Sequence, residues 1–416
     1  MPDLPHDRWP DSTLPLLHDP YRYIPRRARA MRTQAFRMRL MGSPACALTG
    51  RRAARMFYDT DRFTREGAVP RAVGGILFGP KGVIQGTDGA EHLHRKKQGM
   101  DLMAHGAPDD LARRFRQELD AALPRWAAAG TVDLFPEMCR ILTVVACGWN
   151  GVPLPPGDLD DRTRILTDMF NQAGEMSPAS RIRAMRARHG GQKWIGGLID
   201  DIRKGRADLP PEAPVVRAAG WTHADGMPLP LDVVAGDFLS FLRPIVANAA
   251  WVVFLAHALH VHPTAAESIT GDPDRRDAFV REVRRLYPFF PVVAAIAGEG
   301  VEWDGAPIAP GTRCVLSLYG TNRDPSVWDS PDDFRPDRHL GREVGPFDMI
   351  PQGGGDFLAN HRCAGEWVSV AQMRAAADWL TGAVRYRVAT PDARLDMTAL
   401  PALPKGGFRL CDLRPA

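Results

Sequence analysis

A cysteine at the start of a predicted helix is the residue best suited to chemistry in this chain. Cys363 ends the loop PQGGGDFLANHRC, which has three consecutive glycines at 353–355, and an alanine-rich helical pattern begins at about Glu366. The free N–H groups and positive dipole end of a helix lower the pKa of a nearby thiol and offer donors to a thiolate sulfur. Glycines fit where a bulky, flat cofactor presses on the backbone. The loop therefore predicts a thiolate beside such a cofactor.

A thiolate held in this way is the proximal ligand that a haem iron needs, because its electron donation favours cleavage of an O–O bond on the opposite face. The alternative is that Cys363 is simply buried, as one of six cysteines in the chain, which is the commoner situation for a lone cysteine. The glycine-rich loop favours the iron ligand.

The stretch 347–366, FDMIPQGGGDFLANHRCAGE, resembles the cysteine-loop signature of the cytochrome P-450 superfamily. Cys363 is followed after one residue by Gly365 and preceded by the basic His361. The phenylalanine that the superfamily usually has seven places before the cysteine is absent. With the run GGG and the ending HRCxGE, this departure resembles the bacterial fatty-acid peroxygenases, which hydroxylate or decarboxylate fatty acids with hydrogen peroxide. The resemblance implies haem b as the cofactor, with Cys363 on the iron and His361 also at the cofactor.

The second chemical signal is a charged residue in the middle of an apolar stretch. Residues 228–263 are apolar over a length that could span a membrane, but Asp237, Arg243, Asn248 and His257 interrupt them. A charged residue and a proline at the middle are poorly suited to lipid. The pattern therefore predicts a long helix through the core of the protein.

Arg243 needs an anionic partner in such a helix, because burying a guanidinium alone is costly and its planar fork matches a carboxylate. Pro244 removes a backbone hydrogen bond and predicts a kink that opens a cavity beside the arginine. An internal salt bridge to a protein carboxylate is the alternative. The peroxygenase resemblance implies instead that Arg243–Pro244 anchors the carboxylate of a fatty acid. That carboxylate transfers the proton in place of the acid–threonine pair of conventional relatives, which LRPIVAN lacks.

A glycine-rich stretch, residues 74–100, precedes a basic helical pattern but lacks both phosphate-loop motifs, GxxxxGK[ST] and GxGxxG. By resemblance, Phe78 lines the substrate pocket and Gln85 lies above the iron. His92 and Lys96, four apart on one helical face, would meet the haem propionates. The alternative is a solvated basic face. Relatives that mainly decarboxylate tend to have histidine at the position of Gln85, so the resemblance implies hydroxylation.

The helical segment RRDAFVREVRRL carries a pair of opposite charges. Glu282 and Arg285 are three apart and can pair, which alone usually indicates a surface ion pair. Together with PDDFRPDRHL they resemble the Glu–Arg–Arg cluster of the superfamily, with Arg338 as the third member, and the resemblance implies a scaffold behind the haem. The arginine-rich run at 181–194 is interpreted as a solvated face without function. Three further residues are implied to contact the substrate: Phe170, Phe289 and Phe290.

Size and composition indicate one ordinary globular unit. The 416 residues contain 44% hydrophobic and 25% charged side chains, with no repeat or linker, so we expect a single domain over 1–416. A formal charge of +4 does not indicate nucleic acid. Six cysteines without paired spacing favour a reducing cytoplasm. The N-terminal stretch MPDLPHDRWPDSTLP lacks the apolar core of a signal peptide or membrane anchor.

The predicted elements define a mainly α fold with a smaller β portion, and the resemblance, over roughly residues 15–412, implies the cytochrome P-450 fold. We expect a helical segment at 21–41, a strand at 44–50, a helix at 51–59, several amphipathic helices at 108–207, a hairpin with turns at 301–331, and a helix at 366–381. Strand-like pieces alternate with prolines at the C-terminus.

The resemblance implies a peroxygenase that hydroxylates long-chain fatty acids at the α or β carbon, with side decarboxylation to terminal alkenes. Its partners would be the fatty acid and hydrogen peroxide, without a redox partner protein. Two alternatives stay open from the residues. One is a conventional monooxygenase that receives electrons from a redox protein, and the other is a haem-binding protein without turnover. Neither nucleic acid nor a membrane anchor is expected.

Overall fold

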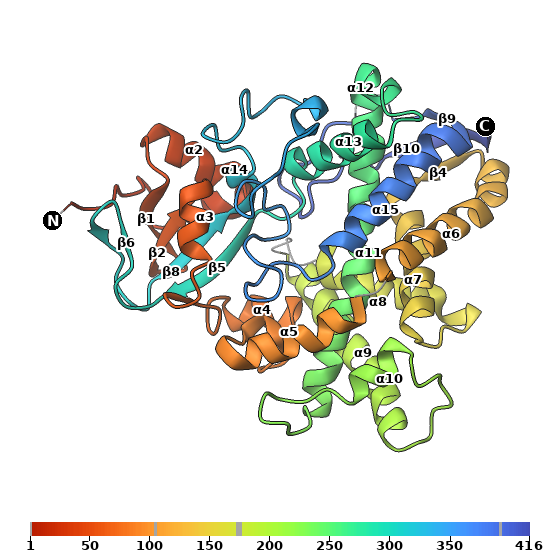
Figure 1. The fold of residues 1–416 in the computed structure, drawn as a ribbon, viewed down its shortest axis with the longest axis horizontal. Helices are drawn as coiled ribbons and strands as arrows, with labels where there is room; N and C mark the ends of the chain where they lie inside the picture. Colours follow the sequence, from red (N-terminus) through yellow and green to blue (C-terminus); the bar gives the residue numbers. More distant parts are fainter. Residues whose placement is uncertain (1, 104–105, 172–176, 391–392) are drawn as a thin grey trace.

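A five-stranded sheet joins the start of the chain to its last third. In the computed structural model, which describes residues 2–103, 106–171, 177–390 and 393–416, this sheet occupies the N-terminal side of the molecule (Figure 1). Its strand order is β1 (Ala35–Leu40), β2 (Ser43–Leu48), β8 (Arg313–Ser317), β5 (Val292–Ala297) and β3 (Phe63–Thr64). Only the β2–β8 pair is parallel among these strands.

Strand β1 corrects the prediction of one helical segment over residues 21–41. Only α2 (Tyr23–Ala30) is helical there, and β1 follows after a turn. Phe36, Met38 and Leu40 are buried, whereas the arginines between them are half-buried or exposed. This alternation has the period of a strand. Basic residues occur in both halves of the segment, so composition did not reveal that the spacing of the apolar residues changes from helical to strand-like.

A single long helix passes through the larger, helical part of the molecule (Figure 1). It is α11 (Leu231–Val261), which packs against α7 (Leu134–Asn150), α8 (Leu159–Asn171), α9 (Pro178–Arg203) and α15 (Glu366–Asp378). Its side chains are apolar on all sides, so neighbours must cover every face. Length and hydropathy alone would allow it to cross a membrane, but 72% of its most apolar window is buried inside the protein. The predicted core helix is therefore present.

The remaining elements complete a mainly helical fold with a smaller β portion, as the sequence predicts. The three-stranded sheet has the order β4 (Thr131–Asp133), β10 (Arg409–Pro415) and β9 (Val384–Val388), and β6 (Glu302–Trp303) pairs with β7 (Ala306–Pro307). The other helices are α1 (Thr13–His18), α3 (Arg51–Phe57), α4 (Arg71–Leu77), α5 (Gly89–Met103), α6 (Ala107–Ala129), α10 (Pro214–Ala219), α12 (Pro263–Glu267), α13 (Pro273–Leu286) and α14 (Leu318–Thr321).

Polar side chains tie α11 to its neighbours. Asn248 donates to Gln372 Oε1 at 2.6 Å and accepts from Ser369 Oγ at 2.8 Å, and both partners lie on α15. His257 lies 2.7 Å from the Tyr287 hydroxyl. Burial lowers the pKa of His257 to about 4, so the ring is neutral at pH 7. These bonds fix the central helix relative to the helix that follows the cysteine loop.

Candidate active site

Cys363 lies three residues before α15, at the end of an irregular loop. Its N–H donates to the Gln352 carbonyl at 3.0 Å, and the Gln352 side-chain amide lies 3.8 Å from the Cys363 sulfur. Burial raises the pKa of this thiol, whereas the Gly365 N–H and the charges of Lys96 and Arg284 oppose that rise. Coordination to a cation would remove the proton. Gln352 carried no sequence signal beyond standing directly before the glycines.

The glycines before the cysteine pack against protein atoms. A Cβ on Gly353 would lie 3.2 Å from the Arg362 backbone, and one on Gly355 would overlap Asn360 Oδ1. Both glycines also have left-handed φ angles, 95° and 85°. Tight folding of the loop on itself therefore accounts for the run, and contact of a cofactor with these glycines stays a prediction. At Gly365, by contrast, a Cβ would meet nothing within 4 Å, so open space lies beside the residue two places after the cysteine.

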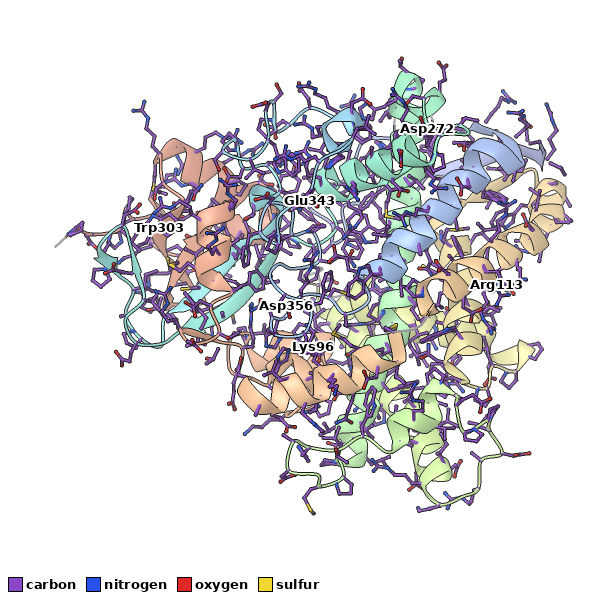
Figure 2. All side chains as sticks on the ribbon, viewed as in Figure 1. Lys96, Arg113, Asp272, Trp303, Glu343 and Asp356 are labelled. Carbon is purple, nitrogen blue, oxygen red and sulfur yellow. The ribbon has the colours of Figure 1, made fainter. Side chains whose placement is uncertain are left out.

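Helix α5 supports this loop from below, as Figure 2 shows for Lys96 and the nearby Asp356. Lys96 Nζ donates to the Arg362 carbonyl at 2.6 Å, and burial lowers its pKa to about 8. The rings of His92 and His361 stack with centroids 3.9 Å apart. Burial lowers the pKa of His92 to about 3 and that of His361 to about 4, so the stacked pair is neutral. The structure thus brings the cofactor-binding candidates together around the loop.

The surroundings of Cys363 fit a metal whose other ligands come from a cofactor. In the described part of the chain, no three His, Cys, Asp or Glu side chains cluster as a metal site. A single soft thiolate beside open space suits an iron porphyrin, which supplies four nitrogen ligands itself. The buried His361 Nε2 has no hydrogen-bond partner among the described residues, and Asp88 Oδ1 lies 3.7 Å away. An acceptor on the cofactor would satisfy this nitrogen.

Gln85 lies in a short 3-10 turn that is fixed to the central helix. The Ile84 N–H donates to Asp237 Oδ1 at 2.9 Å, and Asp237 also pairs with Arg95 from α5. Burial raises the pKa of Asp237, and the Arg95 charge opposes that rise. Gln85 Oε1 is buried and accepts no hydrogen bond from the described residues. Asp237, predicted only as an interruption of the helix, therefore positions the turn that carries Gln85.

Arg243 has no carboxylate partner in the described part of the chain. Its Nη1 donates to the backbone carbonyl of Leu77, and burial lowers the pKa of the guanidinium to about 10. The other polar residues of α11, Asp237, Asn248 and His257, all have side-chain partners. The alternative of an internal salt bridge is therefore wrong for the described residues. Arg243 is a half-buried cation that lacks a carboxylate partner among the described residues.

Pro244 follows Arg243 inside α11, and the helix continues through it. The missing N–H leaves the Ser240 carbonyl without its helical donor. Phe78 is the C-cap residue of α4, directly after the Leu77 carbonyl that Arg243 contacts. The structure therefore places Phe78 on the segment against which Arg243 lies.

The other phenylalanines implied at the substrate have different surroundings. Phe289 stacks on Trp251 of α11 with centroids 4.5 Å apart. Phe170, near the end of α8, is partly buried against the main core. Phe290 is exposed to solvent over 39% of its surface. Both Phe289 and Phe290 come just before β5, which begins at Val292.

The scaffold residues meet as a fully paired cluster behind the loop. Arg285 donates twice to Glu282, at 2.7 and 2.8 Å, and Arg338 Nε lies 3.2 Å from the same carboxylate. His339 Nε2 adds a contact of 2.8 Å that the sequence did not predict. Burial tends to raise the pKa of Glu282, but the hydrogen bonds from Arg285 and His339 and the Arg285 charge lower it to about 2.

Arg188 is a buried residue that the sequence reasoning missed. The run at 181–194 was interpreted as a solvated face, yet Arg188 is only 7% exposed. Its Nε donates to the Ile76 carbonyl at 3.1 Å and its Nη2 to the Leu77 carbonyl at 2.8 Å. A signal was present, because Ala184 and Gly191 are buried on the same face at helical spacing. The prediction of a wholly solvated run is wrong at Arg188.

Comparisons with known proteins agree with this site. The cytochrome P-450 family model matches residues 276–381. The chain is similar to cytochrome P450SP alpha (CYP152B1) in complex with (R)-ibuprophen, at 39% identity over 98% of this chain and 99% of that chain, with a TM-score of 0.95. It is also similar to cytochrome P450EX alpha (CYP152N1) with myristic acid, at 33% identity over 100% of each chain and a TM-score of 0.95.

A third similar structure is a variant of cytochrome P-450 OleT in complex with arachidonic acid. It is 32% identical over 100% of this chain and 99% of that chain, with a TM-score of 0.95. Curated relatives match over a shorter part, and the chain spans 14% to 34% of the length of three of them.

Proposed function

The chain belongs to the CYP152 branch of the cytochrome P-450 superfamily, and from this premise we propose that it is a fatty-acid peroxygenase. It is a haem-iron oxidoreductase by membership. We propose haem b as the cofactor, hydrogen peroxide as the oxidant and a long-chain fatty acid as the substrate, without a redox partner protein. The reaction is hydroxylation at the α or β carbon, with some decarboxylation to a terminal alkene.

The observation that carries the proposal is Arg243, a half-buried guanidinium on the core helix with no carboxylate partner among the described residues. A buried cation is costly without an anion, and a carboxylate matches its planar fork with two parallel hydrogen bonds. A fatty acid supplies both that carboxylate and an apolar tail. The fatty acids named with two of the similar structures support this substrate class.

Arg243 orients the substrate by its charged end. With the carboxylate held at the guanidinium, only the carbons next to it come within reach of the oxidant, which favours the α and β positions. The bound carboxylate oxygen is also the group that accepts and returns a proton of the peroxide, as a general acid–base. Pro244 leaves the Ser240 carbonyl, one turn earlier, without its helical donor. The absence of an acid–threonine pair in LRPIVAN supports this role of the substrate.

The loop and α5 hold the cofactor in this proposal. Cys363 would ligate the iron, His92 and Lys96 would meet the propionates, and His361 would also lie at the cofactor. When bound, the haem supplies the oxidising chemistry, and the thiolate favours O–O cleavage by electron donation. Support comes from the position of Lys96 against the loop and from the unsatisfied Nε2 of His361.

Side chains around the carboxylate site shape the channel. We propose that Phe78, Phe170, Phe289 and Phe290 contact the apolar chain. Gln85 holds its place on the turn tied to Asp237. Its amide neither gains nor loses a proton near neutral pH, in contrast to a histidine. This neutrality supports hydroxylation as the main outcome.

Several coarser features belong to the same proposal. The Glu282 cluster, with Arg285 and Arg338, is a scaffold behind the haem. Residues 1–416 form one domain, in which α11 connects the cysteine helix to the carboxylate site. All six cysteines are free thiols, which supports a soluble protein in a reducing cytoplasm.

Product analysis tests the proposal. The haem-loaded protein is incubated with myristic acid and hydrogen peroxide, and the extracted acids are analysed by gas chromatography and mass spectrometry. We expect 2- and 3-hydroxy acids, with a smaller amount of terminal alkene. Products that form only with NAD(P)H and electron-transfer proteins would identify a conventional monooxygenase. No oxidised product across fatty-acid chain lengths would favour a haem-binding protein without turnover.

A further inference from the structure

The buried guanidinium of Arg188 and the half-buried one of Arg243 converge on one backbone oxygen beside the proposed carboxylate site. Arg188 from α9 donates its Nη2 to the Leu77 carbonyl at 2.8 Å, and Arg243 from α11 donates its Nη1 to the same oxygen. One carbonyl oxygen has two lone pairs, so both bonds are possible. The arrangement places two like charges side by side at the end of α4.

Neither charge has a protein anion within the described residues. Arg188 is 7% exposed, and its buried Nη1 has no hydrogen-bond partner there. A Cβ on Gly79 would lie 3.6 Å from that nitrogen, so the chain after Phe78 closes around the guanidinium. Burial and the Arg243 charge lower the pKa of Arg188 to about 9. Arg188 Nη1 is thus a buried donor, covered by the chain at Gly79, that no described residue accepts.

Other buried arginines of the protein are paired with carboxylates. Arg95, Arg284 and Arg285 are each at most 4% exposed and have Asp237, Glu366 and Glu282 as respective partners. Burying a cation with its anion is the general rule. Arg188 departs from it, and the half-buried Arg243 beside it also lacks a carboxylate among the described residues. The two together favour an anion that comes from outside the chain.

We propose that Arg188 is a second guanidinium of the substrate-carboxylate site and selects ionised acids over neutral chains of equal length. The inference rests on the proposed function, because it deepens the recognition of the fatty acid at Arg243. A carboxylate has two oxygens. When Arg188 and Arg243 both face the carboxylate, each guanidinium can donate to one of these oxygens. Arg188 also holds the Ile76 and Leu77 carbonyls, and so positions the end of α4 beside Arg243.

A purely structural role is the competing explanation, since helix ends leave carbonyls that need donors. The same helix offers a matched control. Arg203 on α9 also donates its Nε and Nη2 to two backbone carbonyls, those of Ala219 at 2.9 Å and Leu229 at 3.0 Å. Arg203→Gln therefore removes the same kind of contact, but from a residue that shares no carbonyl with Arg243.

The test measures binding of myristic acid and of 1-tetradecanol to the haem-loaded protein by isothermal titration calorimetry. We expect Arg188→Gln to weaken binding of the acid about tenfold, since one charge-assisted hydrogen bond is lost. Binding of the alcohol should change by less than about twofold, because it carries no charge to lose. Arg188→Lys should retain part of the preference for the acid, and Arg203→Gln should retain all of it.

Equal weakening of acid and alcohol binding in Arg188→Gln, with a lower urea midpoint, would overturn the proposal in favour of helix capping. If Arg188→Gln does not fold, Arg188→Lys decides. A reduced preference for the acid supports the shared site, whereas an equal loss for both ligands, which leaves the preference unchanged, overturns it. Peroxide is absent from this experiment. A protein that binds the acid through Arg188 but oxidises nothing would therefore contradict the proposed function and leave this inference standing.

Discussion

The cluster at Glu282 and the pair of Arg188 and Arg243 both hold arginines inside the protein, but their charges are balanced in opposite ways. Glu282 receives Arg285 and Arg338, so the cations at that site share an anion, and His339 adds a hydrogen-bond contact. Arg188 and Arg243 share only a backbone carbonyl. A buried charge network that is complete within the protein holds structure together. One that lacks its counter-ion is a candidate for ligand binding.

The comparison also explains why the two sites tolerate burial. A cation removed from water without an anion costs several kcal/mol. At Glu282 the cost is offset within the folded chain. At Arg243 it is reduced in the free protein by the Leu77 carbonyl and, in our account, is fully offset only when a fatty acid binds.

Removing the anion from the paired site should have the largest effect on stability. Glu282→Gln leaves Arg285 buried without a carboxylate, and we expect a loss of about 3–5 kcal/mol in the free energy of unfolding. Urea unfolding of the haem-loaded protein measures this loss. A change below about 1 kcal/mol, the range of an exposed ion pair, would contradict the assignment of the cluster as a scaffold.

The same carboxylate predicts a pH dependence. The pKa of Glu282 is lowered from 4.5 to about 2 in the folded protein. The stabilisation is therefore fully present above pH 4.5 and is lost as the pH falls through 2, with an expected size of about 3 kcal/mol. Urea unfolding between pH 5 and pH 2 measures it, and Glu282→Gln should remove this part of the pH dependence. An identical pH profile in the variant would refute the prediction.

Removing a cation from the unpaired site should have little effect on stability. Arg243→Gln loses a hydrogen bond to the Leu77 carbonyl but also removes a buried charge, so we expect a change within about 1 kcal/mol in the absence of fatty acid. Urea unfolding under the conditions used for Glu282→Gln gives the direct comparison. A loss as large as that of Glu282→Gln would show that Arg243 has a protein anion after all.

The smallest expected effect concerns the product ratio. Gln85→His places a titratable ring on the turn held by Asp237 and should raise the share of alkene relative to hydroxy acid by a few-fold. Gas chromatography of the products measures the ratio. Gln85→Asn, which keeps a neutral amide, is the control. An equal shift in the product ratio of both variants would show that the proton of the histidine is not the cause.

The sequence predicted the parts of the site that depend on local pattern. Cys363 before α15, the apolar α11 with Arg243 inside it, and the pairing of Glu282 with Arg285 all follow from residue spacing along one element. The mainly α fold and its smaller β part were predicted in the same way. These features are set by neighbours within one or two helical turns.

The missed parts depend on contacts between distant segments. Arg188 was placed in solvent because charge alone was considered and the buried face of α9 was not. Gln352 lies on a loop and His339 ends a short 3-10 helix, and their partners are fixed only by the folded chain. Strand β1 was predicted as helix because its pairing with β2 adds hydrogen bonds that no local pattern reveals.

The most direct test of the central claim is peroxide-driven oxidation of myristic acid by Arg243→Ala. The carbon-monoxide difference spectrum of the reduced protein first establishes that thiolate ligation is intact. We predict that the variant keeps this spectrum but loses product formation by about a hundredfold or more, since the carboxylate is no longer held for proton transfer. Product formation at the wild-type rate, with the same spectrum, would contradict the account.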